Sequence, residues 1–127
     1  MNQTEFLQRL VLNTICDDFE NIDQIIWPVV AEQSAKCGLT IGRSDVVDAL
    51  RVLIAAGLAK AYHLSPSLPD PFSGVLHGMP PVDIIEENFT TYFFITKAGM
   101  EFHLANGKWW PFDDEDGLKP EWIVPQP

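Results

Sequence analysis

The sequence predicts one α+β domain that is mostly helical and carries a small antiparallel β-hairpin. Apolar side chains recur every three to four residues along residues 5–16 and 44–56, which is the spacing of amphipathic helices. Two segments with aromatic or β-branched residues, 59–64 and 90–96, favour strands. A chain of 127 residues with 46% hydrophobic residues is long and apolar enough to bury one core.

The first 40 residues predict two helices separated by a short helical turn. Thr4 is a candidate N-cap for a first helix over residues 5–16, and residues 22–27 are expected to form a short turn. Proline lacks an amide hydrogen and fits best in a first helical turn, so a second helix is expected to begin near Pro28. Gly38 supplies the left-handed conformation that ends this helix.

The third helix has the strongest signals in the chain. Ser44 is a good N-cap, and Asp45 beside it suits the positive end of the helix dipole. Gly57 is expected to close the helix, with Leu58 folding back over the last turn. The apolar stripe consists of Val46, Leu50, Leu53 and Ile54.

Strands are expected at residues 59–64 and 90–96, joined by a long loop over residues 65–89 that contains five prolines. Both alternating faces of segment 90–96 are apolar, so we expect this strand to be covered on both sides. Thr96 is the expected N-cap of a last helix that runs to Ala105. The inner face of this helix is expected to hold Met100 and Leu104.

The order of these elements resembles that of winged helix-turn-helix proteins. The residues that carry the resemblance are the Ser44 cap, the run 53–58 (LIAAGL) and the run 92–99 (YFFITKAG). The last run is similar to the strand-turn-helix that follows the wing in bacterial regulators of the MarR and PadR type. The resemblance covers residues 5–105 and implies a reader helix at 44–56 and a long wing between the strands. The nucleic-acid-binding residues that it implies are Arg43, Ser44, Arg51 and Lys60.

The charge of the chain argues against DNA as the partner. Eighteen acidic residues against eight basic ones give a formal charge of −10, which repels nucleic acid and anionic membranes at long range. The predicted wing has no Lys or Arg, although a groove-reading surface normally presents cations and amides. With Leu50 inward, the reader helix presents two carboxylates and one guanidinium, on an outward face made of Ser44, Asp45, Asp48, Arg51, Val52 and Ala55.

These observations predict a non-catalytic protein that acts through protein–protein contacts, and the alternative is a DNA-binding transcriptional regulator. We expect a winged-helix domain at residues 1–107 and a tryptophan-rich tail at 108–127 that packs on this domain or on a partner. Aromatic residues are enriched at the centres of interfaces, so we also expect a homodimer. The candidate interface residues are Trp109, Trp110, Phe112 and Trp122.

No pattern in the sequence names a reaction, a metal site or a cofactor. The histidines lack the spacing of a zinc motif, so we expect them to be structural; they are His63, His77 and His103. The acidic run 113–117 fails as a calcium-binding EF-hand loop, because the first and last ligand positions fall on Phe112 and Ile123.

The remaining sequence signals concern the compartment. Cys16 and Cys37 have no C-x-x-C spacing and are expected to be core residues of a protein in a reducing environment. The N-terminus has no basic region before its apolar residues, and no apolar run approaches the ~18 residues of a spanning helix. The expected location is therefore the cytoplasm.

Overall fold

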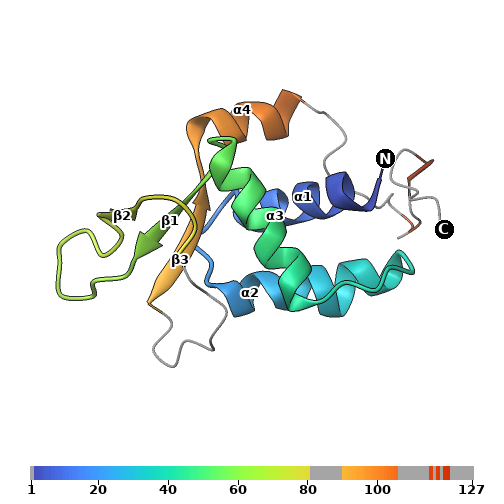
Figure 1. Cartoon of the computed structure of the whole chain (residues 1–127), viewed down its shortest axis with the longest axis horizontal. Helices are drawn as coiled ribbons and strands as arrows, with labels where there is room; N and C mark the ends of the chain where they lie inside the picture. Colours follow the sequence, from blue (N-terminus) through green and yellow to red (C-terminus); the bar gives the residue numbers. More distant parts are fainter. Residues whose placement is uncertain (1, 81–89, 106–114, 116, 118, 121–127) are drawn as a thin grey trace.

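The computed structural model describes residues 2–80, 90–105, 115, 117, 119 and 120, and it has the predicted α+β class (Figure 1). Helix α1 packs against α3, η1 and α4, and the antiparallel sheet lies at the other end of the molecule (Figure 1). In chain order the described elements are α1 (Gln3–Thr14), α2 (Ile22–Ile26), η1 (Trp27–Ser34), α3 (Arg43–Ala55), β1 (Ala59–His63), β2 (Gly74–Leu76), β3 (Thr91–Ile95) and α4 (Lys97–Ala105).

Helix α1 begins and ends two residues earlier than predicted. The side chain of Asn2, and not that of Thr4, caps it by accepting a hydrogen bond from the amide of Glu5 at 2.8 Å. Asparagine caps a helix as well as threonine does, so the sequence pattern alone does not choose between the two positions. The buried side of α1 consists of Phe6, Leu7, Leu10, Val11 and Leu12.

The predicted helix boundary at Pro28 is wrong, because the helix runs through this residue. The chain is α-helical up to Ile26 and then widens into the π-helical segment η1. A proline inside an α-helix removes one amide donor and its ring clashes with the carbonyl four residues earlier. A wider turn relieves that conflict without ending the helix, so the proline changes the helix type.

Both ends of this combined helix are capped. Asn21 Oδ1 accepts from the amide of Gln24 at 2.9 Å, and Gln24 Oε1 accepts from the amide of Asn21 at 2.8 Å. At the other end Gly38 has a φ of 70°, and the amide of Leu39 donates to the carbonyl of Ser34 at 3.0 Å. The prediction of a left-handed glycine cap at Gly38 is confirmed.

Helix α3 begins one residue before the predicted cap, because Gly42 and not Ser44 is its N-cap. Asp45 fixes this start, since its carboxylate accepts a hydrogen bond from the amide of Gly42 at 2.8 Å. The predicted end is confirmed. Gly57 has a φ of 76°, and the amide of Leu58 donates to the carbonyl of Leu53 at 2.9 Å, so the chain reverses directly into β1.

The sheet has the order β2-β1-β3, and β1 is antiparallel to both neighbours. Strand β2 was not expected, because it lies inside the predicted loop 65–89 and is only three residues long. On the outer edge of β3, the amide of Phe93 donates to the carbonyl of Glu20 at 2.8 Å, and the amide of Glu20 donates to the carbonyl of Phe93 at 3.1 Å. The segment between α1 and α2 therefore pairs with β3.

Strand β3 is covered on both faces, as predicted. Phe93 and Ile95 are buried in the core that the helices form. On the opposite face Phe94 stacks on Phe19 with ring centroids 4.6 Å apart, and Phe19 stacks on Phe72 at 4.1 Å. Tyr62 and Tyr92 complete this aromatic cluster through edge-to-face contacts.

Thr96 caps α4 as predicted, and it also joins this helix to α3. Its hydroxyl accepts from the amide of Gly99 at 2.9 Å and donates to the carbonyl of Gly57 at 2.6 Å. The predicted inner face is wrong at Leu104, which is 64% exposed, and Met100 is only partly buried. Gly99 and His103 face the core instead. A glycine allows the helix to approach so closely that a different side of α4 is buried.

Candidate functional site

The outward side of α3 is the surface that the sequence singles out, and the structure leaves it open. Five of the six residues predicted to point outward are exposed: Ser44, Asp48, Arg51, Val52 and Ala55. The sixth, Asp45, is half-buried because it caps the helix. The helical projection is therefore confirmed, and the surface combines carboxylates with a single guanidinium from Arg51.

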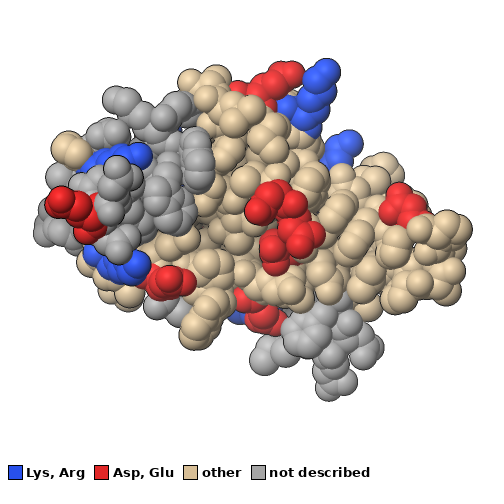
Figure 2. Space-filling view, turned by 180° about the vertical axis from the view of Figure 1, so that it is seen from behind, with Lys and Arg blue, Asp and Glu red and all other residues tan. Residues whose placement is uncertain are grey.

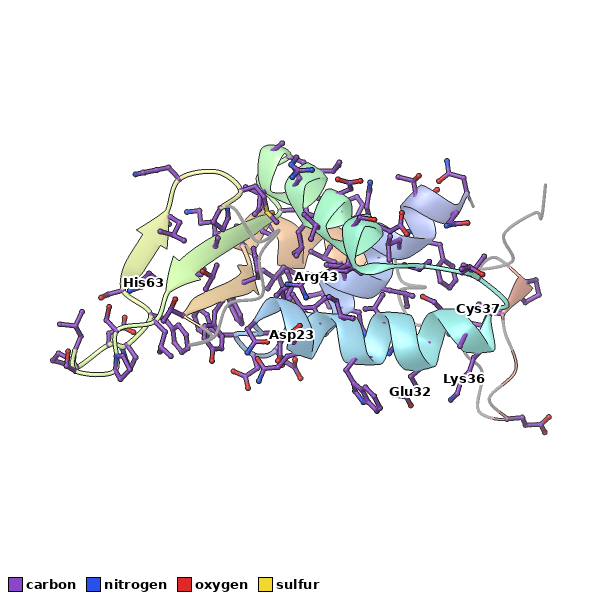
Figure 3. All side chains as sticks on the ribbon, turned by 60° about the horizontal axis from the view of Figure 1, so that its bottom comes forward. Asp23, Glu32, Lys36, Cys37, Arg43 and His63 are labelled. Atoms are coloured by element: carbon purple, nitrogen blue, oxygen red, sulfur yellow. The ribbon has the colours of Figure 1, made fainter. Side chains whose placement is uncertain are left out.

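The arginines of this region are in ion pairs with carboxylates. Arg51 Nη1 donates to Asp48 Oδ1 at 2.7 Å on the exposed side of α3. Arg43 Nη1 donates to Asp23 Oδ1 at 2.9 Å and so joins the start of α3 to α2 (Figure 3). Exposed ion pairs of this kind contribute about 0.2–1 kcal/mol each, so their main effect is to offset the positive charge locally.

The four residues implied by the winged-helix resemblance do not form one cationic patch. Arg43 and Ser44 lie in the first turn of α3, and Arg51 lies about 12 Å further along the helix axis at 1.5 Å per residue. Lys60 is exposed on β1, after the reversal at Gly57. Of these four, two arginines are paired with carboxylates, and serine carries no charge.

A small hollow borders the outward face of α3. It has a volume of about 210 Å³ and lies between the start of α1 and the first three turns of α3. Its walls combine carboxylate and amide side chains with the apolar side chains of Leu7, Ala49 and Val52, and its volume is below that of usual ligand pockets. The lining residues are Gln3, Thr4, Leu7, Gln8, Asp45, Asp48, Ala49 and Val52.

A second hollow, at the start of the α2–η1 helix, was missed by sequence reasoning. It is open and has a volume of about 620 Å³. Trp27 contributes to it and is 70% exposed, a large fraction for a tryptophan. The sequence signal for a negatively charged surface here is the run 10–35, which has no Lys, Arg or His. The lining residues are Glu20, Asn21, Asp23, Gln24, Trp27 and Pro28.

The electrostatics of this hollow are dominated by carboxylates. Burial raises the pKa of Glu20 above its ordinary value, and the negative charges of Asp18 and Asp17 raise this pKa further. On the face of the molecule opposite to the view of Figure 1, Asp and Glu side chains lie at the centre and also toward the edges, whereas the Lys and Arg side chains lie toward the edges (Figure 2). A cation near Glu20 would offset the repulsion between these like charges.

Residues that suggest chemistry are dispersed. Within the described part of the chain, no group of three or more His, Cys, Asp and Glu side chains is arranged to hold a metal ion. His63 and His77 are exposed, whereas burial lowers the pKa of His103. The predicted core position of the two cysteines is only half right, because Cys16 and Cys37 are free thiols that are partly buried, and burial raises the pKa of each.

Several predicted features lie outside the described residues. These include the candidate interface residues Trp109, Trp110, Phe112 and Trp122, most of the acidic run 113–117, and residues 81–89 of the predicted wing. Over the residues that are described, no helix combines the length and the apolar character needed to cross a membrane.

Comparison with known proteins adds no relative from which a role could be transferred. No family model, no curated protein and no solved structure matches the chain.

Proposed function

We propose that this chain is a winged-helix protein that acts through protein–protein contacts and has no catalytic role. The element order supports the winged-helix assignment. Helix α1 is followed by a segment that pairs with β3 at Glu20, then by α2–η1, by α3, and by the antiparallel strands β1 and β3. The proposal makes α3 the counterpart of the reader helix.

The observation that carries the functional proposal is the Asp48–Arg51 ion pair on the outward face of α3. A phosphate close enough to contact Arg51 also lies near the carboxylate of Asp48. In water, two unit charges at about 4 Å interact by about 1 kcal/mol, so the attraction of one and the repulsion of the other nearly cancel. The face therefore offers little of the phosphate attraction that dominates DNA affinity, whereas it suits a polar protein surface.

A retention experiment tests this proposal. The protein is applied to heparin and to immobilised nonspecific duplex DNA at about 50 mM salt, where cation-mediated binding is strong. We expect it to pass through both columns. The Asp48→Asn variant removes the opposing carboxylate and serves as the matched control, since a gain of retention in this variant would show that Asp48 is what prevents binding.

The alternative is a DNA-binding transcriptional regulator, and the exposure of Ser44, Arg51 and Lys60 around α3 favours it. Selection from a random duplex library separates the two functions. For a regulator, Arg51→Ala should lose about 1–3 kcal/mol of discrimination at one base position. A selected site bound at nanomolar affinity at physiological salt, and lost in this variant, would overturn the protein-contact proposal.

A further inference from the structure

The indole side chain of Trp27 is exposed, and the helical backbone on both sides of it holds it in this position. It is the first residue of η1 and precedes Pro28, and the capping box at Asn21 and Gln24 anchors the turn before it. A single exposed apolar side chain is common on protein surfaces and marks no site by itself. Trp27 differs because it borders an open hollow of about 620 Å³ whose other lining residues are polar or acidic, apart from Pro28.

The charge around this hollow is negative and only partly compensated. Asp17, Asp18, Glu20 and Asp23 lie within seven residues of sequence that contain no cation. Arg43 offsets Asp23 through the 2.9 Å ion pair. Among the described residues, no cationic group is paired with the carboxylate of Glu20, whose backbone is held in place by its two hydrogen bonds to Phe93.

We propose that this hollow binds a basic segment of a partner protein, with an arginine or lysine side chain lying on the indole of Trp27 and its charge next to Glu20. This inference rests on the proposed protein-contact function. An aromatic face attracts a cation through its quadrupole, and an arginine can stack on it while it pairs with a carboxylate. Nucleic acid does not fit the hollow, because its phosphates would meet the carboxylates.

The probe is a nine-residue amidated peptide with three arginines separated by glycine and serine, and the control peptide has citrulline at the same three positions. Citrulline keeps the shape of arginine and removes its charge. Binding to the full chain is followed by the indole N–H signals in heteronuclear NMR, where Trp27→Phe identifies the Trp27 signal. We expect the arginine peptide to shift this signal and the citrulline peptide to leave it in place.

Matched variants separate the hollow from the general negative charge of the protein. Trp27→Ala should weaken the arginine peptide about threefold to fivefold, whereas Leu104→Ala, at another exposed apolar residue, should leave its affinity unchanged. Glu20→Gln and Glu101→Gln each remove one negative charge, and only the first should weaken binding beyond the effect of net charge. Circular dichroism verifies that each variant is folded.

Three results would overturn the inference: a response to the citrulline peptide equal to that of the arginine peptide, equal weakening by Glu20→Gln and Glu101→Gln, or a homodimer that dissociates in Trp27→Ala. The last would assign the hollow to a second copy of the chain. These failures are distinct from a failure of the proposed function, which would appear as retention on DNA whether or not the peptide binds.

Discussion

Adding a single methyl group at Gly99 should lower the stability of the fold. The amide of Thr96 donates to the carbonyl of Leu58 at 3.0 Å, and this bond brings the start of α4 against the end of α3. A β-carbon at position 99 would collide with that same carbonyl oxygen and would also press on the side chain of Ile95. The Gly99→Ala variant therefore tests whether the two helices meet as closely as described.

We expect Gly99→Ala to lower the free energy of unfolding, whereas Gly→Ala in a helix usually raises it. In an open helix, Gly→Ala raises stability by about 0.5–1 kcal/mol, because alanine restricts the unfolded chain and favours the helix. At position 99, overpacking by one methyl group costs about 1–3 kcal/mol, and the displaced Thr96–Leu58 hydrogen bond adds about 1 kcal/mol. After the gain from alanine is subtracted, we expect the free energy of unfolding to fall by about 1–3.5 kcal/mol, equivalent to a decrease of roughly 4–13 °C in Tm for a chain of this size.

Urea denaturation followed by circular dichroism at 222 nm measures this change directly. The Ala98→Gly variant, at an exposed position in the same turn, calibrates helix propensity and should cost about 1 kcal/mol or less. If Gly99→Ala is as stable as the wild type or more stable, the close contact between α4 and the α3–β1 turn does not exist, and the assignment of Gly99 and His103 to the buried face is wrong.

The remaining predictions concern the core, the buried histidine and the tail. Leu53→Ala should lower the free energy of unfolding by about 2–5 kcal/mol, whereas Leu104→Ala should change it by less than about 0.5 kcal/mol; similar values in urea denaturation would mean that the helical faces are misassigned. Because burial lowers the pKa of His103 below its ordinary value of 6.5, the unfolded chain binds this proton more tightly. Stability should therefore fall as the pH decreases through about 6.5 and below, and His103→Gln should flatten this part of the stability profile; an unchanged profile would show that His103 is solvated. Truncation after Gly107 should either monomerise or aggregate the protein, because apolar tail residues need a surface to cover, and a stable monomer in sedimentation before and after truncation would contradict this.

The parts of the fold that were predictable from sequence depend on local chemistry. Gly38 and Gly57 end helices because each adopts a positive φ that other residues avoid, and Thr96 caps α4 through its own hydroxyl. The stripe on α3 follows from helical spacing alone. These signals involve residues within a few positions of one another, so they can be recognised without knowing which other elements pack against them.

The parts that were missed depend on contacts between distant segments. Strand β2 exists because Val75 and its neighbours pair with β1, and three residues carry too weak a pattern to reveal this. The buried side of α4 is decided by how closely Gly99 approaches Leu58, which is 41 positions away in the sequence. The Trp27 hollow was missed because Pro28 suggested a helix boundary, whereas a continuous helix places the indole on a fixed outer turn.

Arg43 links the start of α3 to the Trp27 hollow, and its ion pair with Asp23 affects the charge of both surfaces. It begins α3, where the resemblance to DNA-binding regulators implies a phosphate contact, yet its guanidinium lies against Asp23, which lines the Trp27 hollow. A phosphate bound to this guanidinium would also lie near the carboxylate of Asp23 and would be repelled by it. A basic protein segment faces no such conflict, because its own cations add to the compensation that Arg43 already provides. The same ion pair therefore opposes a phosphate at the start of α3, and it leaves Glu20, among the described residues, as the lining carboxylate that the proposed basic segment would contact.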